Sequence, residues 1–297
     1  AKVVAGSSDV SINNIMEEVS KNSTDENQTL SAQVLKAIVD SDSGKINIIN
    51  DDVKDLMISQ TIQSAQNQQE GIGVQQDQDM TSIVSDIIVN TNTNTGSKMI
   101  EELNNSSTKN NLSLQVISGI SEKDITKLNT LSENNKEQID TLTESAVKNA
   151  GESQENADLI AQVVGEVSDE MADKLISEVT KNSTDENQAL SAKVLKSIVE
   201  SNPDKMETLS DENKDNMITQ TILAAKNQSE GISTDDLDLT NTIAEIISSS
   251  GAETASKVLE ELSNSSQGSD SKLSLEVVNN LTKQENYEEK MEILEAT

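Results

Sequence analysis

The segment Lys21-Asn22-Ser23-Thr24-Asp25-Glu26-Asn27-Gln28 occurs a second time, unchanged, as residues 181–188. The two copies lie 160 residues apart, and the similarity between them continues on both sides of the segment. Self-similarity at a fixed period is typical of repeat proteins, in which each unit buries its apolar face against its neighbours. The long repeat, and not any single motif, therefore decides the architecture.

The similarity runs nearly from one end of the chain to the other. Ala1, Val3 and Val4 align with Ala161, Val163 and Val164. Further segments that pair at the same offset are residues 31–36 with 191–196, 60–62 with 220–222, and 70–72 with 230–232. The offset then shifts slightly, so that residues 101–103 pair with 260–262 and residues 112–114 with 273–275.

A weaker copy lies halfway along the long period. Glu17-Glu18-Val19, an Asn/Ser-rich turn and residues 30–34 resemble Glu101-Glu102-Leu103, its own turn and residues 112–116. The basic unit is therefore about 80 residues long, half of the long period of about 160. We divide the chain into the end of a preceding repeat (1–16), three units (17–100, 101–176 and 177–259) and a partial fourth unit (260–297).

The composition excludes several classes of partner. The chain has 53 acidic and 22 basic residues, a net charge of −31, and every basic residue is Lys. So negative a surface repels nucleic-acid phosphates and anionic membranes. No run of about 20 apolar residues is present to span a bilayer. Any protein partner is expected to be basic, and the other expected partners are neighbouring repeats and further copies joined end to end.

The residue types also argue against catalysis. The chain contains no His, Cys, Phe or Trp, and Tyr287 is its single aromatic residue. Zinc sites and His-based triads are therefore not expected, and no Ser-x-x-Lys, Gly-x-Ser-x-Gly or Gly-rich phosphate loop occurs. We predict a non-enzyme with no catalytic, cofactor-binding or metal-binding residues and no cofactor. Low hydrophobicity with high charge also fits disorder, but the periodic apolar positions favour a fold.

Those apolar positions predict helices. Thr24 or Asp25 is expected to cap a helix that runs to about Val39, with Leu30, Val34 and Ile38 on one face. Asp42-Ser43-Gly44 should end it, and residues 45–50 should form a short connecting segment. No convincing period-2 alternation marks a strand.

A second set of helices follows in the same unit. Asp51 or Asp52 is expected to cap a helix whose apolar residues are Val53, Leu56, Met57, Ile62 and Ala65. After a loop over residues 70–79, helices are predicted over 80–89 and 97–104, with a turn over 90–96. We predict an all-α fold of tandem helical hairpins, stacked as an elongated α-solenoid.

Two apolar segments within the unit resemble each other. Val34-Leu35-Lys36-Ala37-Ile38-Val39 is similar to Ile83-Val84-Ser85-Asp86-Ile87-Ile88. This implies an older hairpin of roughly 40 residues, and in length and pattern it resembles HEAT and armadillo repeats. The Pro, Asp and Arg positions that mark HEAT hairpins are missing, which leaves a simple row of helical bundles as the alternative.

Several acidic or repeated motifs are candidate sites. Asp40-Ser41-Asp42-Ser43-Gly44, with Asp51 further on, partly resembles a calcium loop, but Gly44 and Lys45 stand where the loop needs an oxygen ligand and Gly. A polar turn between helices explains it better. Asp77 with Asp79, and Asp235, Asp236 and Asp238, form a second acidic loop, for which loose binding of a hard cation is the alternative to a polar loop. The adjacent pairs Glu101-Glu102 and Glu260-Glu261 are acid/base candidates, but a solvated face of an amphipathic helix explains them better.

The copied motif itself has two interpretations. Ser23, Thr24 and Asp25 are all good helix N-caps, so the motif is explained by a capped turn, and a binding role is the alternative. The acidic, Asn/Ser/Thr-rich composition resembles that of giant repetitive adhesin-like surface proteins of bacteria. That resemblance implies a spacer, stalk or fibre segment of a longer extracellular or cell-surface protein, with a cytoplasmic location as the alternative. A protein-binding scaffold and a self-assembling filament subunit are the competing functional hypotheses.

Overall fold

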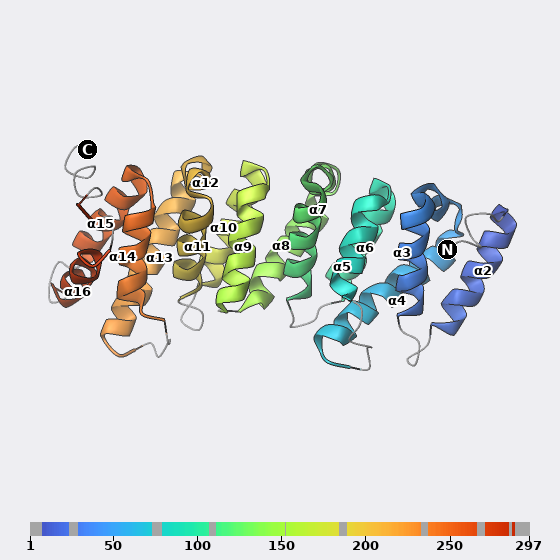
Figure 1. Ribbon diagram of the computed structural model, residues 1–297, viewed down its shortest axis with the longest axis horizontal. Coiled ribbons are helices and arrows are strands. Elements are labelled where there is room, and N and C mark those ends of the chain that lie inside the picture. Colours follow the sequence, from blue (N-terminus) through green and yellow to red (C-terminus); the bar gives the residue numbers. More distant parts are fainter. Residues whose placement is uncertain are drawn as a thin grey trace. The chain divides into compact units, whose positions relative to one another are not determined.

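The computed structural model of the chain is helical throughout the part that it describes (Figure 1). The described residues are 8–23, 29–72, 79–106, 111–151, 153–183, 189–232, 237–265, 271–284 and 287–288. Within these ranges no strand occurs, so the all-α prediction is confirmed. The chain divides into two compact units, Ala1–Asn149 and Ala150–Thr297.

Unit 1 consists of two helical layers in contact. Its elements are α2 (Asp9–Asn22), α3 (Leu30–Asp42), η1 (Ser43–Ile48), α4 (Asp51–Gln69), α5 (Met80–Asn90), α6 (Thr93–Asn105), α7 (Leu112–Asn134) and α8 (Lys136–Ala150), which ends at the unit boundary. In one layer α5 packs between α3 and α7, and in the other α4 packs between α2 and α6. Successive helices in the chain therefore alternate between layers, as antiparallel hairpins.

Unit 2 repeats this order. Its elements are α9 (Gln154–Glu166), α10 (Asp169–Asn182), α11 (Leu190–Ser201), α12 (Pro203–Thr208), α13 (Asp211–Ser229), α14 (Leu239–Ser249), α15 (Ala252–Ser265) and α16 (Ser271–Leu281). One layer runs α9, α11, α14, α16 and the other runs α10, α13, α15. α10 and α13 begin and end 160 residues after α2 and α4, so the long sequence period is also a period of helices.

Short polar side chains set where the helices begin. Asn50 caps α4, because its side-chain oxygen accepts a hydrogen bond from the backbone N–H of Asp52 at 3.2 Å. The prediction that Asp51 or Asp52 is the cap was therefore wrong. Both carboxylates lie in the first turn instead, where negative charge is favourable near the helix N-terminus.

Two other expected boundaries differ in the structure. α6 begins at Thr93, capped by Asn92, so only two residues separate it from α5 and Gly96 lies inside the helix. Ser23 ends α2 rather than beginning α3, and its hydroxyl donates to the carbonyl of Val19 at 3.2 Å. α3 begins at Leu30 with Thr29 at its N-cap position, so the prediction that Thr24 or Asp25 caps this helix was wrong. Thr24 and Asp25 themselves lie outside the described residues.

The core of both units is aliphatic. Met57, Ile62 and Ala65 on α4 are buried as predicted, but Leu56 is 47% exposed and its expected core position was wrong. Ile58 is buried in its place at 2% exposure. The helix presents Met57 and Ile58 to its neighbours because buried positions recur at spacings of three to five residues, and Leu56 falls on the opposite side of that stripe.

A buried polar tether joins three helices of unit 1. The hydroxyl of Ser31, which is fully buried on α3, donates to Gln60 Oε1 at 2.6 Å and lies 2.7 Å from the hydroxyl of Ser23. Gln60 on α4 in turn donates its Nε2 hydrogens to the carbonyls of Ser20 at 2.9 Å and Ser23 at 3.1 Å. The repeated motif thus contributes Ser23 to the packing of α2 against α3 and α4.

Removing this tether should destabilise unit 1. Gln60→Ala leaves the buried Ser31 hydroxyl and two backbone carbonyls short of a partner, so we expect a loss of about 1–3 kcal/mol in unfolding free energy. Urea denaturation followed by circular dichroism measures it. Gln63→Ala, at an exposed position one turn away, is the control and should stay within about 0.5 kcal/mol of wild type. Equal effects of the two substitutions would contradict the tether.

An ion-pair bridge joins the α3, α5 and α7 layer. Asp86 on α5 accepts from Lys36 Nζ at 3.1 Å and from Lys123 Nζ at 2.8 Å, and its side chain is 22% exposed. Partial burial opposes ionisation of Asp86, but the hydrogen bonds from Lys123 and Lys36 outweigh it and lower the pKa of this carboxyl below its ordinary value. The bridge is therefore strongest with Asp86 ionised.

The contribution of Asp86 should depend on pH. Because its pKa is lowered in the folded chain, its stabilisation is present above the ordinary carboxyl pKa and is lost as the pH falls through the lowered value. Asp86→Asn should therefore cost about 1–2 kcal/mol near neutral pH, and its difference from wild type should shrink at acid pH. Denaturation curves across the acid range test this, and a difference that stays constant with pH would contradict it.

Candidate functional site: a groove in unit 2 whose lining residues recur in unit 1

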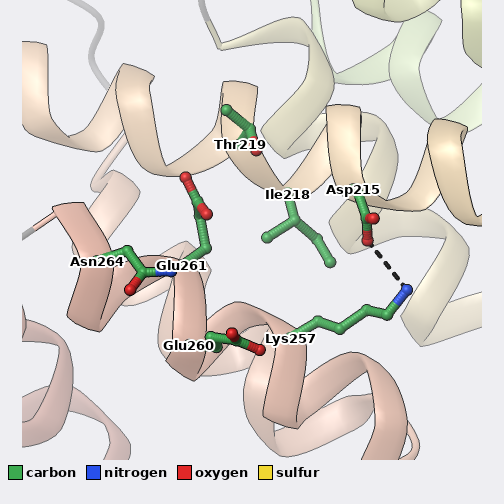
Figure 2. A pocket seen from close by; sticks show the side chains of 7 residues that line it. All are labelled: Asp215, Ile218, Thr219, Lys257, Glu260, Glu261 and Asn264. Carbon is green, nitrogen blue, oxygen red and sulfur yellow. Dashed lines mark hydrogen bonds and ion pairs between the residues drawn. The ribbon is translucent and has the colours of Figure 1, made fainter.

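A groove of about 270 Å³ lies between α13 and α15 of unit 2 (Figure 2). α13 contributes Asp215, Ile218 and Thr219, which its turns bring to one face by their spacing of three and four residues. The facing residues on α15, spaced in the same way, are Lys257, Glu260, Glu261 and Asn264. The groove has an apolar floor at Ile218 and polar groups around it.

One ion pair closes an end of the groove. Lys257 Nζ lies 3.0 Å from Asp215 Oδ1 and 3.5 Å from Asp211 Oδ1, and Figure 2 shows the Lys257 side chain extending toward Asp215. The hydrogen bond to Asp215 raises the pKa of Lys257 despite its partial burial. The pKa of Asp211 is lowered, first by its hydrogen bond from Lys214. Lys257 is thus charged and engaged, while Glu260 and Glu261 supply the excess negative charge.

The same residues recur between α4 and α6 of unit 1. Counterparts of the seven lining residues, taken in order, are Asp55, Ile58, Ser59, Lys98, Glu101, Glu102 and Asn105, and only Ser for Thr219 differs. Lys98 Nζ contacts Asp55 Oδ1 at 2.5 Å, and this hydrogen bond raises the pKa of Lys98. Ser59 donates to Glu102 Oε1 at 2.7 Å. The two surfaces have the same chemistry.

Retention of this surface contrasts with changes around it. Asp55, Glu101 and Asn105 are exposed, yet each is identical in the second unit. Three other exposed positions on α4 differ from their α13 counterparts: Asp52 from Glu212, Leu56 from Asn216 and Gln63 from Leu223, although the exposed Asp51 is also retained, as Asp211. Even the buried Met99 of α6 is replaced, by Val258. Exposed residues ordinarily drift faster than core residues, so the retained polar face is the strongest indication of a role on this surface.

The groove suits a cationic, hydrogen-bonding group better than a reaction. Two carboxylates, an amide and a hydroxyl can accept hydrogen bonds from an ammonium or guanidinium group, while Ile218 can contact its alkyl stem. Among the described residues, no group of three or more acidic side chains is arranged to hold a metal ion. The Glu101-Glu102 and Glu260-Glu261 pairs weighed as acid/base candidates belong to these two surfaces.

The other acidic candidates have structural partners. Asp40 pairs with Lys36 at 2.9 Å in the last turn of α3, and Asp42 accepts from the backbone N–H of Gly44 at 3.1 Å to begin η1. Asp79 and Asp238 are the N-caps of α5 and α14. Hydrogen bonds, first from the Thr240 hydroxyl, lower the pKa of Asp238. Asp77, Asp235 and Asp236 lie outside the described residues.

Sequence reasoning found part of the groove and missed the rest. It singled out the Glu pairs, but not Asp215, Lys257 or Asn264, because it weighed adjacent residues rather than helix faces. The signal was present in the repeat itself: exposed residues identical in both copies and spaced three or four apart on two helices that pack together.

Comparison of the sequence with protein-family models and with curated proteins found no match. None of the helices in the described part of the chain is both long and apolar enough to cross a membrane.

Proposed function

We propose that this chain is a non-catalytic structural segment, a spacer, stalk or fibre portion of a larger extracellular or cell-surface protein, built as an α-solenoid. The observation that supports this most is the recurrence of the same hairpin order and interhelical contacts in both units. Each hairpin adds to the one before it, and length is then gained by adding copies. A cytoplasmic location is the alternative.

Packing within each unit agrees with a role that needs length and shape rather than chemistry. α5 is covered on both sides by helices of its own layer, and so is α11. The polar groups that recur between copies mostly cap helices or join them, as Ser23 and Ser183 do with Ser31 and Ser191 at 2.7 and 2.6 Å. Repetition of these contacts between helices keeps the packing geometry the same from copy to copy.

Small-angle X-ray scattering on the monomer tests the spacer proposal. A compact globule of this length has a radius of gyration of about 19 Å and an unfolded chain about 61 Å. A stack of hairpins should exceed the compact value by several ångströms, stay far below the unfolded one and give a skewed distance distribution. A radius of gyration at the compact value with a symmetric distribution would contradict the proposal.

The retained groove favours a second candidate function, a scaffold that binds a basic protein segment. Its support is the conservation of Asp, Lys, Glu, Glu and Asn at matching exposed or half-exposed positions of α4–α6 and α13–α15. Two equal surfaces on one chain would bind a partner with two basic segments more tightly than either surface alone. Nucleic acid and membrane lipids do not fit this surface, because it carries excess negative charge.

A fluorescent hexa-arginine peptide tests this candidate in an anisotropy titration at low salt. The combined variant Glu101→Gln, Glu102→Gln, Glu260→Gln and Glu261→Gln should weaken binding at least about tenfold, a loss of about 1.4 kcal/mol. Its control removes four exposed carboxylates elsewhere: Asp52→Asn, Glu133→Gln, Glu144→Gln and Glu212→Gln. The same loss in both variants would mean that the peptide senses only net charge and that the groove has no special role.

A further inference from the structure

The segment that carries the retained Glu pairs occurs four times in the chain. Residues 101–105 of α6 and 260–264 of α15 end in Asn, whereas the aligned residues 17–21 of α2 and 177–181 of α10 end in Lys. All four segments have Glu at their second position. α2 and α6 pack on either side of α4 in one layer, and α10 and α15 pack on either side of α13. The segments therefore occupy equivalent helices and differ in whether a lysine follows the shared Glu by three residues.

Where the lysine is present, it occupies the glutamate of its own helix. Lys181 Nζ lies 2.5 Å from Glu178 Oε1 in α10. In α2, Lys21 Nζ lies 2.8 Å from Glu17 Oε1 and 3.4 Å from Glu18 Oε1. The hydrogen bond from Lys21 lowers the pKa of Glu17. Residues three apart on a helix are neighbours on its surface, which places the ammonium beside the carboxylate.

Where Asn replaces the lysine, the equivalent carboxylates lack a cation. Within the described residues, the carboxylates of Glu260 and Glu261 form neither an ion pair nor a hydrogen bond, and Glu102 accepts a hydrogen bond from the Ser59 hydroxyl at 2.7 Å but pairs with no lysine. Figure 2 shows Glu261 and Asn264 at the end of the groove away from the Lys257 ammonium. That end is therefore open to a cation from outside the chain.

The contrast between the copies indicates what that cation is. So acidic a chain must leave many carboxylates without a lysine, but Glu102 and Glu261 belong to the lining that both units retain. Their counterparts Glu18 and Glu178 hold a primary ammonium on a flexible alkyl stem. The α6 and α15 copies have the same carboxylate at the same helix position, and they lack the group that a lysine side chain supplies.

The geometry of the carboxylate favours an ammonium over a guanidinium group. A guanidinium fork donates two parallel hydrogen bonds to both oxygens of one carboxylate, and Ser59 already donates to Oε1 of Glu102. Adjacent residues on a helix do not face each other, so Glu101 and Glu102 cannot jointly replace that pair of oxygens. An ammonium is a compact point charge that needs a single oxygen, as in the contact of Lys181 with Glu178 Oε1.

We propose that the groove recognises a lysine side chain of a basic partner segment, whose ammonium binds Glu261 in unit 2 and Glu102 in unit 1 as Lys181 binds Glu178. Its alkyl stem lies over Ile218, and the Asn264 amide oxygen accepts a further hydrogen from the ammonium. This assignment rests on the proposed scaffold function and names the group that the scaffold recognises.

Two peptides of equal charge test the choice of lysine. In anisotropy titrations, fluorescent hexa-lysine should bind at least about threefold more tightly than fluorescent hexa-arginine. Equal affinities, or tighter binding of hexa-arginine, would overturn the lysine assignment, and the fourfold Glu→Gln variant would then show by itself whether the scaffold function stands. A wild-type chain that binds neither peptide would overturn both.

A variant that copies the internal lysine tests the site. Asn105→Lys with Asn264→Lys places an ammonium three residues after Glu102 and Glu261, and circular dichroism should show the wild-type helical signal. The introduced lysines should weaken hexa-lysine binding at least about tenfold.

The matched control adds the same charge elsewhere. Asn14→Lys with Asn279→Lys changes two exposed positions on α2 and α16. In about 0.1 M salt, where exposed charges more than about 10 Å apart are largely screened, it should change the affinity less than about twofold. Equal losses in the variant and its control would show that the peptide senses net charge alone, and would overturn the proposal.

Cadaverine separates a protein partner from a free amine, because it has the same ammonium and a similar stem. It should displace hexa-lysine only at a concentration at least about a hundredfold higher, since a peptide with several lysines gains from multiple contacts. Displacement at equal concentration would assign the groove to a small amine and overturn the protein partner.

Discussion

The structure depends on one constraint: a helix such as α11 carries apolar residues on two sides and cannot bury both within its own hairpin. Leu190 and Val194 lie on the side where α9 packs, and Ala192 and Leu195 are buried as well, with α13 and α14 on the following side. Each fully buried large aliphatic side chain contributes about 1.5–3 kcal/mol. A hairpin without neighbours would lose much of this, so stability accumulates along the stack.

Lysine side chains are the second feature on which the packing of the helices depends. In a chain of this charge, a Lys that lies between helices both neutralises carboxylates and joins elements. Lys214, which is 5% exposed, pairs with Asp211 of its own helix α13 at 3.1 Å and with Glu253 of α15 at 3.5 Å. Lys36 and Lys196 reach Asp86 and Glu245 across to the next helix of their layer. The Lys36–Asp86 and Lys196–Glu245 pairs, whose side chains are 22–30% exposed, are less screened by salt than fully exposed pairs.

The sequence was enough to predict the fold class and the helices that have strong apolar periodicity. The helix expected over 80–89 is observed as Met80–Asn90, and the core residues Ile83, Ile87 and Ile88 follow from its pattern. Helix caps were harder to predict, because Asn50, Asp51 and Asp52 are all good capping residues. Which of them caps α4 depends on how the preceding η1 leads into the helix. Leu56 shows that an apolar residue at a helical spacing need not lie on the face of the helix that packs against neighbouring helices. The groove could not be predicted from the sequence, because its lining residues come together only where α13 and α15 pack against each other.

Amide hydrogen exchange measured by mass spectrometry tests the dependence on neighbours most directly. α5 and α11 each have helices of their own layer on both sides, whereas α16 has a described neighbour on one side only. Stacked hairpins should therefore exchange most slowly in α5 and α11 and faster in α2 and α16, with matching protection in equivalent helices of the two units. Uniform protection across all these helices, or slowest exchange in α16, would contradict the account.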